Sequence, residues 1–337
     1  MHVRFYQGIY VHVNAGPWLK PAFDRVLQSA RMDQLPHAIL VHGAPGWGET
    51  NLATSIAEYF IGLAPGELGI KSAENFAHPD FHWLQPEAPG KQIKVDQIRR
   101  LRSFVLQTCQ IAERKVAVIV DAHLMNINAA NALLKTLEEP PGECLLVLST
   151  NAHHDLLPTI RSRCQSLPIR PHYDSANIAW VKTQLDSVLT GAESIATDEL
   201  NILLFEFGGA PMFVLQAIQR GEKGLLPDLL VCVGRSDQIA RILPAWLKLD
   251  LDIVLSRWMR YLNVLLEARS RSLVDSGDIG NNLQALENAL NKASKAKLLI
   301  FWEELCWAKR LMHSTSNINQ TLLLERLLLH WCELAHS

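Results

Sequence analysis

The sequence predicts a parallel α/β domain in the first half of the chain and an all-helical region in the second half. Three observations predict this fold class. Short apolar runs alternate with amphipathic helical patterns as far as about residue 170, as they do in a parallel sheet covered by helices. A glycine-rich turn typical of a phosphate-binding loop follows the first run. Beyond Pro171 the strand patterns stop, and apolar residues recur at helical spacing.

Four short apolar runs are the expected strands of the sheet, because each is bounded by turn or helix signals. Alternating apolar residues between Val3 and Val13 predict either one more strand or a loose tail. The four expected strands are Ala38–His42, Phe81–Leu84, Val116–Val120 and Leu145–Ser149.

Amphipathic patterns between these strands predict the helices that cover the sheet. They are expected at Thr50–Ile61, Val95–Leu106 and Asn128–Glu138. In the last of these, Asn128 is the expected N-cap, and Pro140-Pro141 is the expected stop.

The second half of the chain predicts only helices, which glycine-rich breaks near residues 208 and 221 divide into groups. We therefore expect three domains: an α/β domain over 1–170, a small helical domain over 171–220 and a larger helical domain over 221–337. The expected helices are Ser175–Leu189, Asp198–Phe207, Met212–Gln219, Asp250–Leu273, Lys292–Met312 and Thr321–Ala335.

Composition excludes several classes of protein. Lys+Arg 32 against Asp+Glu 34 gives a net charge of −2, which disfavours a protein that holds DNA alone through a basic surface. No apolar run approaches the length of a membrane span. The 6 cysteines are not at metal-ligand spacing, so we expect buried free thiols in a reducing cytoplasm. They are Cys109, Cys144, Cys164, Cys232, Cys306 and Cys332.

The run Gly43-Ala44-Pro45-Gly46-Trp47-Gly48-Glu49-Thr50 fits the P-loop pattern G-x-x-x-x-G-K-[ST] except at the lysine. Glu49 takes that place, and its carboxylate would repel a phosphate at roughly 4 Å by about 1 kcal/mol in water, and by more in a drier site. We therefore expect Gly43, Gly46, Gly48, Glu49 and Thr50 to be vestigial, with no bound ATP. Two alternatives stay open: this loop never belonged to a nucleotide site, or ATP still binds through the backbone alone.

A second nucleotide-binding element is an apolar strand that ends in an acid, and Val116–Asp121 supplies it. ATPases of this type place a glutamate next, which activates the attacking water. Ala122 stands there instead and has no proton acceptor. Asp121 and Ala122 are therefore interpreted as a vestigial Walker B motif.

Two further runs carry a resemblance to a known family. They are Leu133–Pro141, which reads LLKTLEEPP, and the triplet Ser162-Arg163-Cys164. With Trp18-Leu19-Lys20-Pro21, they resemble the delta-prime subunit family of bacterial DNA polymerase III clamp loaders, over nearly the whole chain. The resemblance implies an AAA+ protein with a RecA-like sheet domain, a three-helix lid and a helical collar. It also implies a ring with gamma/tau ATPases and delta that opens the sliding clamp and loads it on primed DNA.

The resemblance further implies that Arg163, with Ser162 and Cys164 of the same motif, reaches the ATP site of a neighbouring ATPase subunit. A guanidinium group is permanently charged, planar and forked, so it can stabilise charge on a transferring phosphoryl group. The alternatives are a solvated or salt-bridged Arg163, with Arg161 as the rival candidate. The basic cluster Arg99, Arg100, Arg102, Arg114 and Lys115 predicts either DNA contact or a solvated helix face.

Departures from the family pattern concern cofactors. Relatives often carry a four-cysteine zinc module near residues 61–77, and this chain has no cysteine there, so no zinc is expected. Gly208–Phe213 lacks the arginine that active relatives place against their own nucleotide. We therefore expect a cytoplasmic, non-hydrolysing delta-prime subunit without a cofactor. An independently active AAA+ ATPase and a stand-alone DNA-binding protein are the alternatives.

Overall fold

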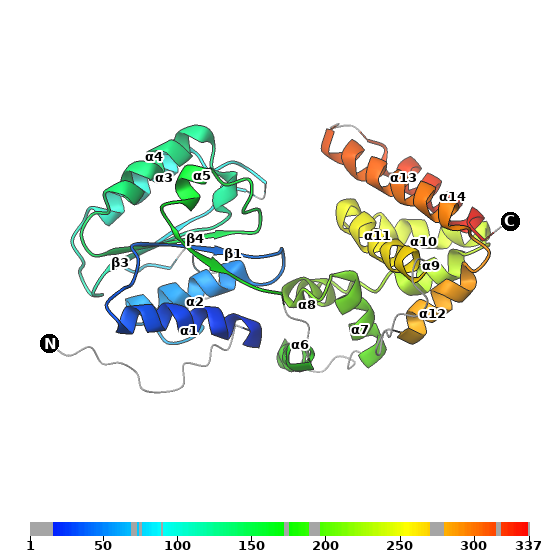
Figure 1. The fold of residues 1–337 in the computed structure, drawn as a ribbon, viewed down its shortest axis with the longest axis horizontal. Helices are drawn as coiled ribbons and strands as arrows, with labels where there is room; N and C mark the ends of the chain where they lie inside the picture. The colour runs from blue at the N-terminus through cyan, green and yellow to red at the C-terminus, as the bar shows by residue number, and fades with distance from the viewer. Residues whose placement is uncertain are drawn as a thin grey trace. The chain divides into compact units, whose positions relative to one another are not determined.

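A computed structural model describes residues 16–68, 73, 76–88, 90–171, 175–188, 196–269, 280–314 and 318–335. The chain forms two compact units, one of residues 1–184 with 210–212 and one of residues 185–209 with 213–337 (Figure 1). The alternating pattern near the N-terminus lies outside the described residues. The division into three domains stays a prediction.

A five-stranded parallel sheet in the order β2-β3-β4-β1-β5 forms the centre of the first unit. The strands are β1 (Ala38–His42), β2 (Phe81–Leu84), β3 (Lys115–Ile119), β4 (Cys144–Thr150) and β5 (Gln165–Pro168). The four predicted strands are thus confirmed to within one residue at each end. The edge strand β5 was not predicted, because its first two residues are polar and exposed.

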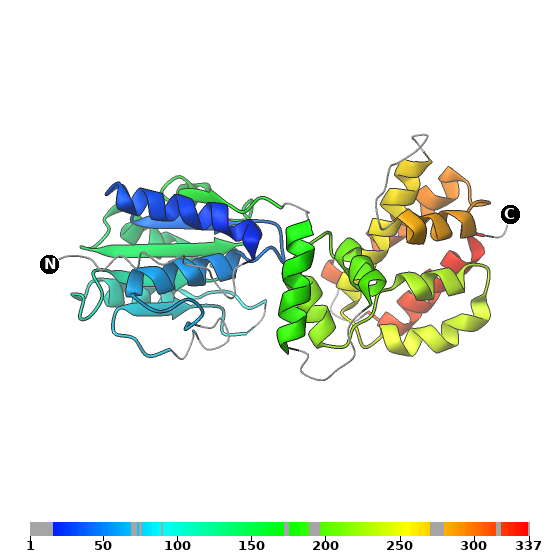
Figure 2. The ribbon, with the colours of Figure 1, turned by 90° about the horizontal axis from the view of Figure 1, so that it is seen from below.

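Helices cover both faces of this sheet. They are α1 (Lys20–Arg31), α2 (Glu49–Ile61), α3 (Val95–Val105), α4 (Ile127–Glu138) and the short α5 (Pro158–Arg161). Figure 1 shows α3, α4 and α5 on one face, and Figure 2 looks onto the face that α1 and α2 cover. The apolar stripes of α3 and α4 pack on β1, β3 and β4 in one buried cluster.

The N-cap of α4 differs from the prediction. Asn126, not Asn128, precedes the helix, and its side-chain oxygen accepts from the Ala129 N–H at 2.8 Å. Both positions hold asparagine, so residue type alone cannot choose between them. Because Ile127 begins the helix although it is 71% exposed, the apolar stripe gave no signal for this first turn.

A buried ion pair closes the amino-terminal edge of the sheet. Asp80 and Lys115 are 0% and 1% exposed, and Lys115 Nζ lies 3.0 Å from Asp80 Oδ1. The backbone N–H groups of residues 110–112 donate to the same carboxylate at 2.6–3.1 Å. Burial alone would raise the pKa of Asp80, but these donors outweigh it and hold the pKa below its usual range. Because Lys115 is buried, it cannot take part in the DNA contact considered for the basic cluster.

Asp80→Asn is expected to lower the free energy of unfolding by about 3 kcal/mol at pH 7, because Lys115 stays buried without its counter-ion. Since the folded pKa of Asp80 is depressed, its contribution is complete above the unfolded pKa of roughly 3.9 and is lost as pH falls through the folded pKa. Urea unfolding at pH 7 and in acid measures both effects. Asp96→Asn, in an exposed pair with Arg99, is the control and should change little. A pH-independent difference between wild type and Asp80→Asn would contradict this account.

The second unit is helical in all the parts that the structure describes. The sequence missed α9, α10 and α12, which are short. Pro244 inside α10 also hides its helical pattern. The helices are α6 (Ser175–Val188, shared with the first unit), α7 (Thr197–Glu206), α8 (Pro211–Gln219), α9 (Leu226–Cys232), α10 (Ile239–Trp246), α11 (Leu251–Ala268), α12 (Gly280–Ala289), α13 (Lys295–Ser314) and α14 (Gln320–Glu333).

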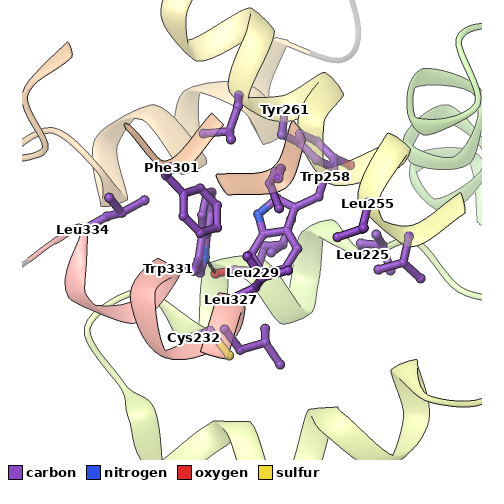
Figure 3. Packing of buried hydrophobic residues seen from close by; sticks show 14 of the residues in the cluster. Leu225, Leu229, Cys232, Leu255, Trp258, Tyr261, Phe301, Leu327, Trp331 and Leu334 are labelled. Carbon is purple, nitrogen blue, oxygen red and sulfur yellow. Dashed lines mark hydrogen bonds between the residues drawn. The ribbon is translucent and has the colours of Figure 1, made fainter. Parts of the chain in front are cut away.

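Aromatic side chains fill the core of this unit. Trp258 packs against Phe301 and Trp331 with ring centroids 5.3 and 5.5 Å away (Figure 3). The Trp331 indole donates to the Leu229 carbonyl at 2.9 Å, which ties α14 to α9. Phe301 and Trp331 are fully buried, whereas Trp307 leaves 42% of its surface exposed.

A second buried ion pair joins α7 to α11. Arg257 donates to Glu206 Oε2 from Nε at 2.7 Å and also from Nη2. Tyr261 donates to Glu206 Oε1 at 2.7 Å, and the Leu225 N–H does so at 2.6 Å. Arg257 also donates to the Lys223 carbonyl at 2.7 Å. Glu206 is 2% and Arg257 1% exposed, so water cannot stabilise their charges. Each charge is stabilised by the other and by these hydrogen bonds.

The cysteines are free thiols, as predicted, but two of them are not buried. Cys109 and Cys306 are half-buried, whereas Cys144, Cys164, Cys232 and Cys332 are buried. Among the described residues, none of the helices has both the length and the apolar character needed to cross a bilayer.

Candidate functional site

The P-loop lies between the carboxyl end of β1 and the start of α2 (Figure 1). Gly46 and Gly48 have φ of 78° and 86°, which side-chain-bearing residues rarely adopt. Gly48 is also the residue that precedes α2. The Gly43 N–H donates to the Thr150 carbonyl at 3.4 Å, which joins the loop to β4. Both glycines therefore stand where a side chain would strain the backbone of this turn.

The Glu49 carboxylate lies against this loop and leaves only 9% of the residue exposed. Burial raises the pKa of Glu49 and the nearby Asp121 charge raises it further, while N–H groups of Glu49 and Gly48 hydrogen-bond the carboxylate and oppose the rise. Oε2 is buried and has no hydrogen-bond partner among the described residues. A buried carboxyl group therefore stands at the position where the P-loop pattern has lysine.

Apolar side chains pack around the P-loop. Trp47 is 3% exposed, and its carbonyl accepts from the Trp18 indole N–H at 2.8 Å. Trp180 meets the Trp18 ring edge-on at 5.0 Å between centroids. A Cβ on Gly48 would lie 3.2 Å from Leu19 and 3.4 Å from Met212. The loop is therefore in close contact with Trp18, Leu19 and Met212.

Asp121 and Ala122, which the sequence analysis interprets as a vestigial Walker B motif, lie just beyond β3. Asp121 has φ of 50°, and Ala122 is fully buried with only a methyl group. Thr150 ends the neighbouring β4, and its hydroxyl bonds His123 Nδ1 at 3.0 Å. The Asp121 charge acts on the pKa of Glu49, and position 122 carries no acid.

The triplet Ser162-Arg163-Cys164 follows α5, away from the P-loop in sequence. Arg163 leaves 36% of its side chain exposed and pairs with Glu138 at 2.7 Å. It also donates to the Thr159 carbonyl at 3.1 Å. Cys164 is buried, and burial raises its pKa to about 12, so its thiol is a packing group. The sequence did not predict the Glu138 partner, although Glu138 lies within LLKTLEEPP.

Metal binding was also considered. His153, His154 and Asp155 follow one another in a turn after β4. No cluster of three or more histidine, cysteine or acidic side chains suited to a metal occurs in the described part of the chain. Residues 61–77, where relatives carry zinc, are only partly described. The expected absence of zinc stays a prediction.

Comparisons with known proteins identify the family. A family model described as "DNA polymerase III, delta subunit" matches residues 19–173. DNA polymerase III subunit delta' of Pseudomonas aeruginosa is 30% identical over 331 residues, which cover 94% of this chain and 97% of that protein. The chain belongs to the DNA polymerase III delta' family. The resemblance inferred from the sequence motifs is confirmed.

The chain is also similar to a second delta' subunit and, more distantly, to a solved structure. The delta' subunit of Escherichia coli is 28% identical and covers 93% of this chain and 94% of its own length. The crystal structure of a DNA polymerase III gamma subunit-related protein from Thermotoga maritima has a TM-score of 0.46 at 19% identity, covering 93% of this chain and 100% of that one. The predicted fold class, a parallel α/β domain followed by helices, is confirmed for this delta' family member.

Proposed function

We propose that this chain is a non-hydrolysing subunit of the clamp loader, which acts in the cytoplasm with gamma/tau ATPases and delta to open the sliding clamp and load it on primed DNA. Within it, Arg163 serves the ATP site of a neighbouring ATPase subunit. One observation carries this proposal: the chain's own P-loop holds a carboxylate, while Arg163 stands half-exposed. The first feature disfavours nucleotide binding, and the second offers a cation to another subunit.

The pairing of Arg163 supports a role in which it can change partners. Exposed ion pairs are typically worth about 1 kcal/mol or less, so leaving Glu138 for a phosphate costs little. The backbone of α5 fixes the base of the side chain, because the Arg163 N–H donates to the Ile160 carbonyl at 3.1 Å. A positioned arginine with a weak local partner suits a trans-acting finger.

The purified chain is expected to show no saturable binding of a fluorescent ATP analogue at micromolar concentrations. The Glu49 carboxylate uses N–H donors of the loop and would repel the phosphates. Glu49→Lys restores the missing cation, so a measurable affinity in that variant alone would locate the loss at this position. Micromolar affinity in the wild type would contradict the proposal.

Exposed apolar side chains on α13 and α14 support assembly through the second unit. Leu322 and Leu329 on α14 are 62% and 42% exposed, and Ile300 and Trp307 on α13 are 54% and 42% exposed. The Arg326 guanidinium of α14 lies 5.4 Å from the centre of the Trp307 ring of α13. The exposed apolar side chains of the two helices are therefore neighbours on the surface. Exposing apolar side chains to water costs a monomer free energy, so neighbouring exposed apolar side chains often mark a protein–protein interface.

Leu322→Glu is expected to abolish co-elution with the other loader subunits in size-exclusion chromatography, because a charge would be buried in the interface. Leu106→Glu is the matched control, since Leu106 is also 62% exposed but lies in the first unit. Normal assembly of Leu322→Glu would show that this surface is not the interface. A chain that ends near Arg220 is a poorer test, because Glu206 would lose Arg257 and the fold would suffer.

The two alternative functions have distinct signatures. Hydrolysis of ATP by the purified chain would support an independent ATPase, which Glu49 and Ala122 disfavour. Salt-dependent binding of primed DNA by the chain alone would support a DNA-binding protein. The net charge of −2 and the burial of Lys115 disfavour that reading.

A further inference from the structure

A cavity of about 700 Å³ lies beside α1 in the first unit, and the proposed function makes no use of it. Its walls come from α1 and the short helix before it (Pro17–Leu19), from residues 168–171 at the end of β5, and from the first turn of α6. A cavity of this size is typical of a site that holds a small molecule or a short stretch of peptide.

The charged groups that line this cavity are all positive. Arg25 of α1 and Arg170, just beyond β5, both line it, and no aspartate or glutamate is among the lining residues. Both arginines are exposed, and neither forms an ion pair with another described residue. Asp24, the acid next to Arg25 in sequence, pairs instead with Lys20. Two guanidinium groups thus share one cavity without an anion between them.

Apolar groups form most of the remaining wall. Trp18 lines the cavity, but it is only 8% exposed, and its ring meets those of Trp47 and Trp180 edge-on at 6.1 and 5.0 Å between centroids. It therefore leaves no open aromatic face on which a nucleobase could stack. Four prolines also line the cavity, and they have no N–H group to donate. They are Pro17, Pro21, Pro168 and Pro171.

A second, smaller hollow adjoins this cavity and follows the edge of the sheet. Arg25 lines both hollows, and residues 165–167 of β5 line the second. β5 is an edge strand, and Gln165 and Ser166 on it are exposed. The two hollows together, which we call the α1–β5 groove, can therefore hold a ligand that extends along β5. A peptide chain has this extended shape, whereas a compact small molecule does not.

We propose that the α1–β5 groove binds an acidic, extended peptide segment of a partner protein, with its carboxylates on Arg25 and Arg170 and its apolar side chains against the prolines. Guanidinium groups hold carboxylates in a planar, bidentate geometry, which favours such a partner. Residues 1–15, which precede the groove in sequence, contain no aspartate or glutamate, so they do not supply the anion. The net charge of −2 provides no wider basic field for nucleic acid.

The test uses the full-length protein and short fluorescein-labelled peptides in which aspartate alternates with leucine or with phenylalanine. Fluorescence anisotropy measures their binding, which we expect to saturate and to weaken as salt is raised. Arg25→Ala and Arg170→Ala should each weaken binding by about tenfold or more, because each removes a charged hydrogen-bond donor. Both residues are exposed, so both variants should fold. Arg31→Ala is the matched control and should bind as the wild type does, because Arg31 is exposed on the same helix but lines neither hollow.

Several results would overturn the proposal. If the wild type does not bind these peptides, or binds them equally well with asparagine in place of aspartate, the groove does not recognise carboxylates. An equal loss in Arg31→Ala would assign the binding to the general charge of the surface. Tighter binding of an oligothymidylate of similar charge, weakened by the same two variants, would make the groove a nucleic-acid site instead. The assay needs neither ATP nor other loader subunits, so its failure is separable from a failure of the proposed function.

Discussion

Replacing Arg163 with alanine is expected to slow hydrolysis at one ATP site of the assembled loader by ~10³–10⁵. That site loses the cation that stabilises charge on the transferring phosphoryl group, while the other sites keep theirs. The variant should still fold and assemble, because Arg163 is half-exposed and its contacts to Glu138 and Thr159 are local. Single-turnover measurement of clamp- and DNA-stimulated hydrolysis separates the affected site from the others.

Matched variants distinguish a trans-acting arginine from a merely structural one. Glu138→Gln breaks the same ion pair but keeps the guanidinium, so hydrolysis should be retained. Arg163→Lys should restore little of the hydrolysis rate that Arg163→Ala loses, because an ammonium group lacks the planar, forked shape of a guanidinium group. Arg161→Ala should slow ATP hydrolysis less than Arg163→Ala does. Equal rates in Glu138→Gln and Arg163→Ala would leave only a structural role.

Local sequence patterns predicted the elements whose signal lies in their own residues. β1, β3 and β4 are buried almost throughout and appear as continuous apolar runs. β5 is a strand because it pairs with β1 at the edge of the sheet, and its own residues give no such signal. The start of α4 depends on which of two nearby asparagines caps it.

The sequence likewise predicted some features of the candidate site and missed others. The family resemblance implied Arg163, and motif spacing predicted Glu49, Asp121 and Ala122 as the informative positions. It did not predict that the Glu49 carboxylate bonds its own loop and leaves one oxygen unpartnered. It also gave no sign of the bond from Trp18 to the Trp47 carbonyl, because that contact joins residues 29 positions apart. Such contacts depend on how the elements pack, which no short pattern encodes.

Arg257→Met is expected to lower the free energy of unfolding by about 3–5 kcal/mol. The substitution leaves the Glu206 carboxylate buried with only Tyr261 and backbone N–H groups as partners. In the wild type, the two Glu206 oxygens accept hydrogen bonds from α11 and from the segment before α9. This carboxylate therefore joins parts of the second unit that are far apart in sequence. Urea unfolding of the full chain measures the loss, followed separately for each unit if the two do not unfold together.

Two comparisons show whether the loss comes from the uncompensated charge. Arg235→Met removes an arginine from an exposed pair with Asp237 at 3.5 Å, and it should change the free energy by about 1 kcal/mol or less. The double variant Glu206→Leu with Arg257→Met replaces the buried pair by apolar groups, so it should recover much of the stability that the single variant loses. The cost then belongs to the unpaired carboxylate and not to lost packing of the arginine stem. If the double variant is less stable than Arg257→Met alone, the remaining Glu206 contacts stabilise the unit on their own.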